Sequence, residues 1–212
     1  MGTFKNGILG GFSGTLGPAV GSSWKGINVI RSRPPRKRCR SSEEQARQMA
    51  RMTLMTKFVH PLTGLLNRTY HNTVERMSTF NKAMSYNMRN AIEGEYPDFS
   101  INYALVRLGN GDLLNPEMSL AHSALQGQLT FTWADNSNQG SARASDQAFA
   151  AVYCPIVNRW KTNEGGAKRN AGSYTLDVAA YSGKAVHTYI GFLAADGKFV
   201  STSLYTGLVN IL

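Results

Sequence analysis

The histidines and aspartates of this sequence are the side chains that could perform acid–base or metal chemistry, and their spacing supports neither. The histidines are scattered along the chain, and the aspartates sit beside expected turns, where this residue caps the backbone. The sequence contains no P-loop, strand-linked GxGxxG, HExxH or GxSxG motif. We therefore expect no catalytic residue, no cofactor and no bound metal. The residues considered are His60, His71, His122, His187, Asp135, Asp146, Asp177 and Asp196.

The two cysteines, Cys39 and Cys154, are too few for a zinc site and form no CxxC pair. One disulfide between them and two separate reduced thiols both remain open from the sequence. Separate thiols are the default expectation.

A run of cations between residues 31 and 40 is the stretch best suited to bind anions. Its prolines forbid a helix, and its charges repel one another. Such a run can bind phosphates by counterion release, but it lacks the aromatic residues that would stack on bases. The alternative reading, a solvated linker or the end of an interface strand, is the more common one. The cations are Arg31, Arg33, Arg36, Lys37, Arg38 and Arg40.

Charge is distributed unevenly along the chain. Residues 1–90 hold 15 Lys and Arg against 3 acids, a net +12, whereas residues 91–212 hold 8 against 10, a net −2. This asymmetry suits a basic tail for nucleic acid or an anionic surface. It equally suits subunits that join front to back.

Large apolar residues recur at every fourth position of the N-terminal stretch, with glycines between them. An extended chain would place these residues on one face, with Leu9 as an exception on the other. The interior glycines and Pro18 strongly disfavour a helix. We therefore expect an extended segment that turns once, at Leu16-Gly17-Pro18-Ala19. The apolar series is Phe4, Ile8, Phe12, Leu16, Val20 and Trp24.

A glycine-rich strand needs a sheet edge that completes its backbone hydrogen bonds. That edge can belong to its own domain, as is usual for a first strand or hairpin, or to a neighbouring subunit. In the second case the segment is a donor strand. We expect the latter: Ile8, Phe12 and Leu16 would fill pockets of another subunit, and Trp24 would anchor the base.

Helices are expected in the middle of the chain. Ser41 with Glu44 fits a capping box, the apolar stripe from Met49 to Val59 follows, and Pro61 should end or kink the helix. A second helical region is expected from about Thr73 to Ile92, with Gly94 as its stop.

From Phe99 onward the pattern alternates with a period of two. A strand over 100–108 with a hairpin at 109–112 is expected first. Further strands are expected over 128–133, 147–153, 173–178, 185–192 and 199–205, with an irregular stretch between Pro155 and Gly172. Short strands separated by Gly, Asn and Asp turns predict an antiparallel sandwich or partly open barrel.

Two resemblances add to this interpretation. Leu129 to Trp133, Ala151 to Tyr153, Tyr174 to Leu176, Val186 to Phe192 and Asp196-Gly197 together resemble a fibronectin type III-like domain over about residues 118–210. The whole chain resembles a bacterial family known only as a domain of unknown function. Gly7 to Gly14, Val20-Gly21, Trp24-Lys25-Gly26, Arg31 to Pro34 and Tyr205 to Gly207 carry that likeness. The resemblance implies an extended N-terminal segment, helices and a β-rich second half, with some members as fibril subunits and no catalytic residues to carry over.

The combined expectation is an α+β protein with an extended segment and basic connector (1–40), a helical region (41–94) and a β-rich domain (95–212) completed by a donated strand. Its expected role is a structural subunit of a helical fibril, a homopolymer outside the cell or on its surface. No clear signal peptide is present, and no apolar stretch is long enough for a transmembrane helix. The alternatives are a nucleic-acid-binding or virion protein that uses the 31–40 arm, and a surface- or carbohydrate-binding module with exposed aromatics such as Trp160 or Tyr181.

Overall fold

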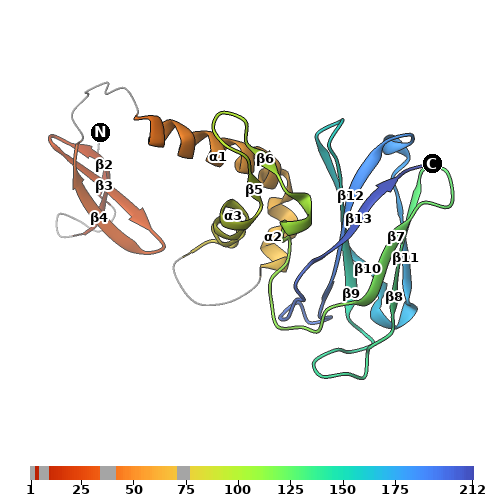
Figure 1. The fold of residues 1–212 in the computed structure, drawn as a ribbon. Coiled ribbons are helices and arrows are strands. Elements are labelled where there is room, and N and C mark those ends of the chain that lie inside the picture. The colour runs from red at the N-terminus through yellow and green to blue at the C-terminus, as the bar shows by residue number, and fades with distance from the viewer. Residues whose placement is uncertain (1–2, 5–9, 34–41, 71–76) are drawn as a thin grey trace. The chain divides into compact units, whose positions relative to one another are not determined.

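A computed structural model describes residues 3–4, 10–33, 42–70 and 77–212 of the chain. These residues divide into two compact units, Met1–Ser42 and Glu43–Leu212 (Figure 1). Each unit is described separately below.

The first unit is a four-stranded antiparallel meander, called the ribbon hereafter. Its strands are β1 (Thr3–Phe4), β2 (Phe12–Leu16), β3 (Ala19–Trp24) and β4 (Ile27–Ser32), in the order β1-β2-β3-β4. The predicted turn at Gly17-Pro18 is confirmed, because Leu16 pairs with Ala19 across it. The prediction of a single turn is wrong, because the chain turns again at Lys25-Gly26, where Trp24 pairs with Ile27. Both turn residues have positive φ angles, a combination typical of two-residue hairpin loops.

The prediction that one face carries the whole apolar series is wrong. Thr15 pairs with Val20 and Leu16 with Ala19, and paired residues share a face. The two-residue turn therefore exchanges the faces, so that Leu16 lies on one side of the sheet and Val20 on the other. Trp24 lies on the side of Val20, opposite Leu16.

The expectation that this segment takes an outside partner for its backbone stays a prediction. Within its own chain, β2 pairs with β1 at Phe12 and Ser13 and with β3 from Gly14 to Leu16. The usual reading of a glycine-rich N-terminus, a hairpin within its own sheet, describes these strands.

The helices of the second unit are α1 (Glu43–Val59), α2 (Thr63–Thr69) and α3 (Thr79–Asn90). Glu43 and Glu44 occupy the first turn of α1, where negative side chains stabilise the helix through its dipole. Ser41 of the predicted capping box lies outside the described residues. Pro61 ends α1 as predicted, within a short 3₁₀ turn (His60–Leu62).

α3 lies inside the second predicted helical region. Ser78 caps its start by accepting a hydrogen bond from Asn81 N. Residues 73–76 of that region lie outside the described chain, and Ile92 belongs instead to β5 (Ile92–Glu93). β5 pairs with β6 (Ser100–Ile101) in a small hairpin.

Seven strands form a sandwich of two antiparallel sheets. One sheet has the order β11-β8-β7, with β7 (Glu117–His122), β8 (Gln128–Ala134) and β11 (Ser173–Asp177). The other has the order β10-β9-β12-β13, with β9 (Gln147–Cys154), β10 (Arg159–Lys168), β12 (Ala185–Leu193) and β13 (Leu204–Asn210). The sheets stay open rather than closing into a barrel, so the protein is an α+β fold with a β-sandwich.

The predicted strand over 100–108 and its hairpin at 109–112 are wrong. Only Ser100–Ile101 is a strand, and Tyr103–Leu105 is a 3₁₀ turn. Side chains replace the expected ladder: Arg107 N donates to Asn87 Oδ1, and Leu108 N donates to Ser203 Oγ. The segment therefore lines the core without pairing as a strand.

Two other strand boundaries also differ from expectation. The stretch expected to be irregular, 155–172, contains the ten-residue strand β10, which pairs with β9. The last strand spans 204–210 rather than 199–205, because Val200 and Ser201 form only isolated bridges.

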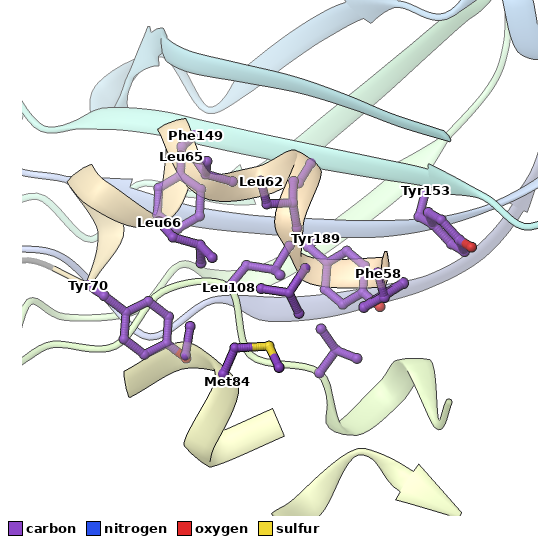
Figure 2. Close-up of a cluster of buried hydrophobic side chains, with 14 of the residues drawn as sticks. Phe58, Leu62, Leu65, Leu66, Tyr70, Met84, Leu108, Phe149, Tyr153 and Tyr189 are labelled. Carbon is purple, nitrogen blue, oxygen red and sulfur yellow. The ribbon is translucent and has the colours of Figure 1, made fainter. Parts of the chain in front are cut away.

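The central sheet is covered on both faces, which makes the second unit three-layered. Phe149, Ala151 and Tyr153 of β9 face a core shared with the helices, whereas Ala148, Ala150 and Val152 face the other sheet. Figure 2 shows the first core, with side chains of α1, α2 and α3 gathered against β9 and β12. This double burial explains why β9 reads as a nearly continuous apolar run.

Candidate assembly surfaces

The outer strand of the ribbon, β4, has the features of an unprotected sheet edge. It pairs only with β3 in the described chain, in a continuous register from Ile27 to Ser32. All six of its residues are exposed, and Ile30 leaves 68% of its surface accessible. Soluble proteins usually protect such an edge with a bulge, a proline or an inward-facing charge. β4 has neither a bulge nor a proline within its length, and Arg31, near its end, is its one charged residue.

One face of the ribbon is also apolar. Trp24 pairs with Ile27, and Val29 lies two residues further along on the same side. Trp24 is 56% exposed, and both β4 side chains are exposed as well. The tip of the β3–β4 hairpin therefore presents an aromatic and two aliphatic side chains next to Lys25.

Most outer edges of the sandwich carry the protection that β4 lacks. β7 has a register shift between Glu117 and Leu120, with a positive φ of 48° at Met118. β13 has a register shift in its pairing with β12, and β10 is irregular between Glu164 and Lys168. Such bulges twist an edge away from further pairing.

β11 differs from the other three outer edges of the sandwich. It pairs with β8 without interruption, from Ser173 opposite Thr132 to Asp177 opposite Gln128. In the described chain, β11 is the end strand of its sheet and pairs with no strand on its other side. β11 is thus the bulge-free edge of the sandwich.

The predicted donor residues are divided between described and undescribed parts of the chain. Phe12, Leu16, Val20 and Trp24 lie in β2 and β3, and Phe4 lies in β1. Ile8 and Leu9 lie outside the described residues. No pocket of a second subunit is present to compare them with, so their expected role in an interface stays a prediction.

The predicted anion-binding arm is described only at its start. Arg31 is exposed near the end of β4. Arg33 is also exposed, and its backbone N donates to Pro18 O. The other four cations, Arg36, Lys37, Arg38 and Arg40, lie outside the described residues, as does Cys39. The sequence of residues 1–42 holds eight Lys and Arg and no acid, a net charge of +8.

The aromatic side chains expected to be exposed for carbohydrate binding are not available. Tyr181 is buried. Trp160 is half-buried, donates from Nε1 to Phe58 O at 2.9 Å, and its ring centre lies 4.9 Å from that of Tyr153. Trp160 packs against the core that the helices share with the sheet, and Tyr181 belongs to the core between the two sheets.

The titratable side chains are placed where they stabilise the fold. His187 stacks on Tyr103, with ring centres 3.8 Å apart, and its Nδ1 lies 2.8 Å from the Tyr205 hydroxyl. Burial lowers the pKa of His187. Cys154 is a buried free thiol in the sandwich core. Across the described ranges, His, Cys, Asp and Glu nowhere gather in a group of three suited to a metal ion.

Sequence reasoning did not single out β4, which is the exposed strand with the fewest protecting features. Its apolar residues Ile27, Val29 and Ile30 provided a signal, since three β-branched residues within four positions favour a strand. None of the helices that the structure describes is long and apolar enough to span a membrane.

Comparisons with known proteins identify a family and a distant structural match. A solved structure, the fn3 domain of human collagen alpha-1(XX) chain, is similar to 49% of this chain and is itself 91% covered, at 13% identity and a TM-score of 0.35. None of the curated proteins matches the chain. The model of a family of unknown function, DUF6266, matches residues 11–207. The protein therefore belongs to the DUF6266 family.

Proposed function

We propose that this protein is a non-enzymatic structural subunit of a helical fibril, and that it polymerises when the ribbon of one copy adds to the β-domain of another. The observation that supports this most is β4: an exposed edge strand with apolar side chains on both faces, without a bulge or a proline, and with Arg31 as its one charged residue. An edge of this kind is a template for pairing with another chain. We further propose that the fibril is extracellular or lies on the cell surface.

β4 is a better donor than the glycine-rich strand β2. Every residue of β2 already pairs with β1 or with β3, so donation by β2 with a free edge on both sides would require breaking one of these pairings. Among the residues that the structure describes, none pairs with the outer side of β4, so this edge can add a strand without any unfolding. Residues before β4, including Phe12, would then contribute by holding the ribbon together.

The acceptor that fits β4 best is β11. Among the outer strands of the sandwich it alone, in the described chain, keeps an uninterrupted register with its neighbour. It ends at Asp177, whereas β4 ends near Arg31, so the two edges also differ in charge. The charge difference favours pairing between unlike edges over pairing of two β4 strands.

This arrangement would produce a filament because the donor and acceptor edges are different surfaces. Each copy offers both edges, so every added copy leaves one of each unused. A heterologous contact that does not close into a ring extends without limit.

Cysteine pairing between two separately purified variants tests the contact directly. One population carries Val29→Cys in β4 and the other Thr175→Cys in β11, both in a Cys39→Ser background. We expect a disulfide between the two populations upon mixing and mild oxidation. Asp177→Cys serves as a second acceptor position, because it lies on the same side of β11 as Thr175.

A matched control replaces Leu208 with Cys on β13, an exposed residue on a bulged edge. The Val29→Cys population should not cross-link to it. Cross-linking of Val29→Cys to itself alone would contradict the proposed acceptor, and the absence of any cross-link involving Val29→Cys would contradict the use of β4.

Nucleic-acid binding is a second candidate, favoured by the eight cations and the absence of acids in residues 1–42. Exposed Arg31 and Arg33 lie in the same unit as the exposed indole of Trp24. Phosphate contacts by this unit would make binding strongly salt-dependent. Retention on single-stranded DNA or RNA at low salt, with a steep loss at moderate salt, would support this candidate over a purely structural role.

A further inference from the structure

We infer that a cavity beside α1 is a binding site for a carboxylate attached to an apolar or aromatic group. The cavity has a volume of about 400 Å³, within the range of small-molecule sites. α1 contributes Arg47 and Arg51, and the β5–β6 hairpin contributes the opposite side. Both parts belong to the second unit, and assembly through the ribbon plays no part in the inference.

The two arginines are placed to act on one ligand. They lie four residues apart on α1 and therefore on the same face of the helix. Arg51 is also fixed in position, because Nη2 donates to Met88 O at 2.9 Å and the guanidinium carbon lies 5.9 Å from the centre of the Phe99 ring. A guanidinium held in this way keeps further N–H groups for a planar oxyanion.

The acid that lines the cavity, Glu95, forms no ion pair with either arginine. Arg51 forms no ion pair with any residue that the structure describes. Arg47 reaches only Glu43 and Glu44, at 3.8 and 3.3 Å, and both carboxylates lie exposed on its own helix. The Nε atoms of both arginines are buried without a hydrogen-bond partner. A bound oxyanion would relieve the repulsion between two adjacent guanidinium groups.

The remaining lining favours an organic acid over an inorganic anion. Phe99, Tyr96 and Ile92 supply an aromatic and aliphatic surface opposite the arginines. The Tyr96 and Phe99 ring centres are 6.5 Å apart. Glu95 also lines the cavity and disfavours a multiply charged anion such as phosphate. A single carboxylate with an apolar body matches the two arginines and the aromatic and aliphatic surface, and it meets less repulsion from Glu95 than a multiply charged anion would.

Such a carboxylate has two sources, a free small acid and a terminus of a peptide chain. The probes that separate them are benzoate and N-acetylphenylalanine, with N-acetylphenylalanine amide and inorganic phosphate as the uncharged and inorganic comparisons. Binding to the full-length ¹⁵N-labelled protein is followed by NMR, through the Nε–Hε signals of the arginines and the amides of residues 92–99.

We expect one or both carboxylates to bind, and the amide and phosphate to bind at least tenfold more weakly. Arg51→Gln and Arg47→Gln should each weaken carboxylate binding about tenfold or more. Arg89→Gln, which removes a cation of α3 that does not line this cavity, should leave binding unchanged. Should Arg51→Gln not fold, Arg51→Lys is the second variant. It retains the positive charge but lacks the paired N–H donors of the planar guanidinium, and it should still weaken binding.

Tighter binding of N-acetylphenylalanine than of benzoate assigns the site to a peptide terminus, and the reverse order assigns it to a free acid. Three results would overturn the inference: no binding of either carboxylate, equal binding of the amide, or carboxylate binding that survives both arginine substitutions.

Discussion

The phenyl ring of Phe12 lies against Gly21, so close that a Cβ on residue 21 would stand 2.7 Å from Phe12 Cδ2 and nearer still to its carbonyl oxygen. The missing side chain of Gly21 thus allows the start of β2 to pack over β3. The ribbon obtains part of its stability from this contact, because its sheet is otherwise widely exposed. Glycine is required here for close approach of the backbone.

Replacing Gly21 with Val should disrupt the ribbon without affecting the second unit. The new side chain would collide with backbone atoms of Phe12, which cannot move aside as a flexible side chain could. We expect faster amide hydrogen exchange in β2 and β3, with unchanged protection in β9 and β12. Ser23→Val is the control, since residue 23 is an exposed position of the same strand. Equal protection of the ribbon in Gly21→Val would refute this account of the contact.

Removing the buried ion pair between Arg169 and Asp146 should strongly destabilise the sandwich. Arg169 is fully buried, with Nε 3.1 Å from Asp146 Oδ2, Nη1 2.6 Å from Asn136 Oδ1 and the Phe192 ring centre 3.8 Å from its guanidinium carbon. Asp146→Ala leaves this charge without its anion, and we expect a loss of about 3–5 kcal/mol in the free energy of unfolding. Urea denaturation monitored by tryptophan fluorescence measures it.

The control is Arg68→Ala, which breaks a largely exposed ion pair with Glu164. That substitution should cost less than about 1 kcal/mol. Comparable losses in the two variants would show that the buried pair does not have the stabilising role assigned to it.

Acidification should destabilise the second unit through His187. Burial lowers the pKa of this side chain below its usual 6.5, so the unfolded chain binds the proton more readily than the folded one. Stability contributed by the neutral ring is therefore present above about pH 6.5 and is lost as the pH falls below that value, until the lowered pKa is passed. His187→Phe keeps the stack on Tyr103 without a titrating group. Its melting temperature should fall less than that of the wild type between pH 7 and 5; an identical fall in both would exclude His187 as the cause.

The sequence predicted those parts of the fold that are determined by local residues rather than by pairing with a distant strand. The helix ending at Pro61, the turn at Gly17-Pro18 and strand β9 follow from local chemistry or from burial on both faces. β10 was missed because its strand state depends on pairing with β9, and its polar and glycine residues give no alternation. The false strand over 100–108 shows the opposite case, in which Asn87 and Ser203 satisfy the backbone that a ladder would otherwise pair.

The candidate site was only partly predictable for a related reason. The every-fourth-residue series correctly drew attention to the N-terminal unit, but the faces depend on turn length: one two-residue turn placed Leu16 and Val20 on opposite sides. The importance of β4 comes from its position at the edge of the ribbon. That position depends on strand order, which the spacing of apolar residues does not encode.

Negative-stain electron microscopy of the full chain beside two charge variants tests most directly whether the edge of β4 drives assembly. Ile30→Lys adds a second cation to that edge, next to Arg31 and in the middle of its apolar residues, and Leu208→Lys places the same cation at a similarly exposed position on the bulged strand β13. We predict fibrils for the wild type and Leu208→Lys, and dispersed single molecules for Ile30→Lys. Fibrils of normal length from Ile30→Lys, or a wild type that remains monomeric at every concentration, would contradict the proposal.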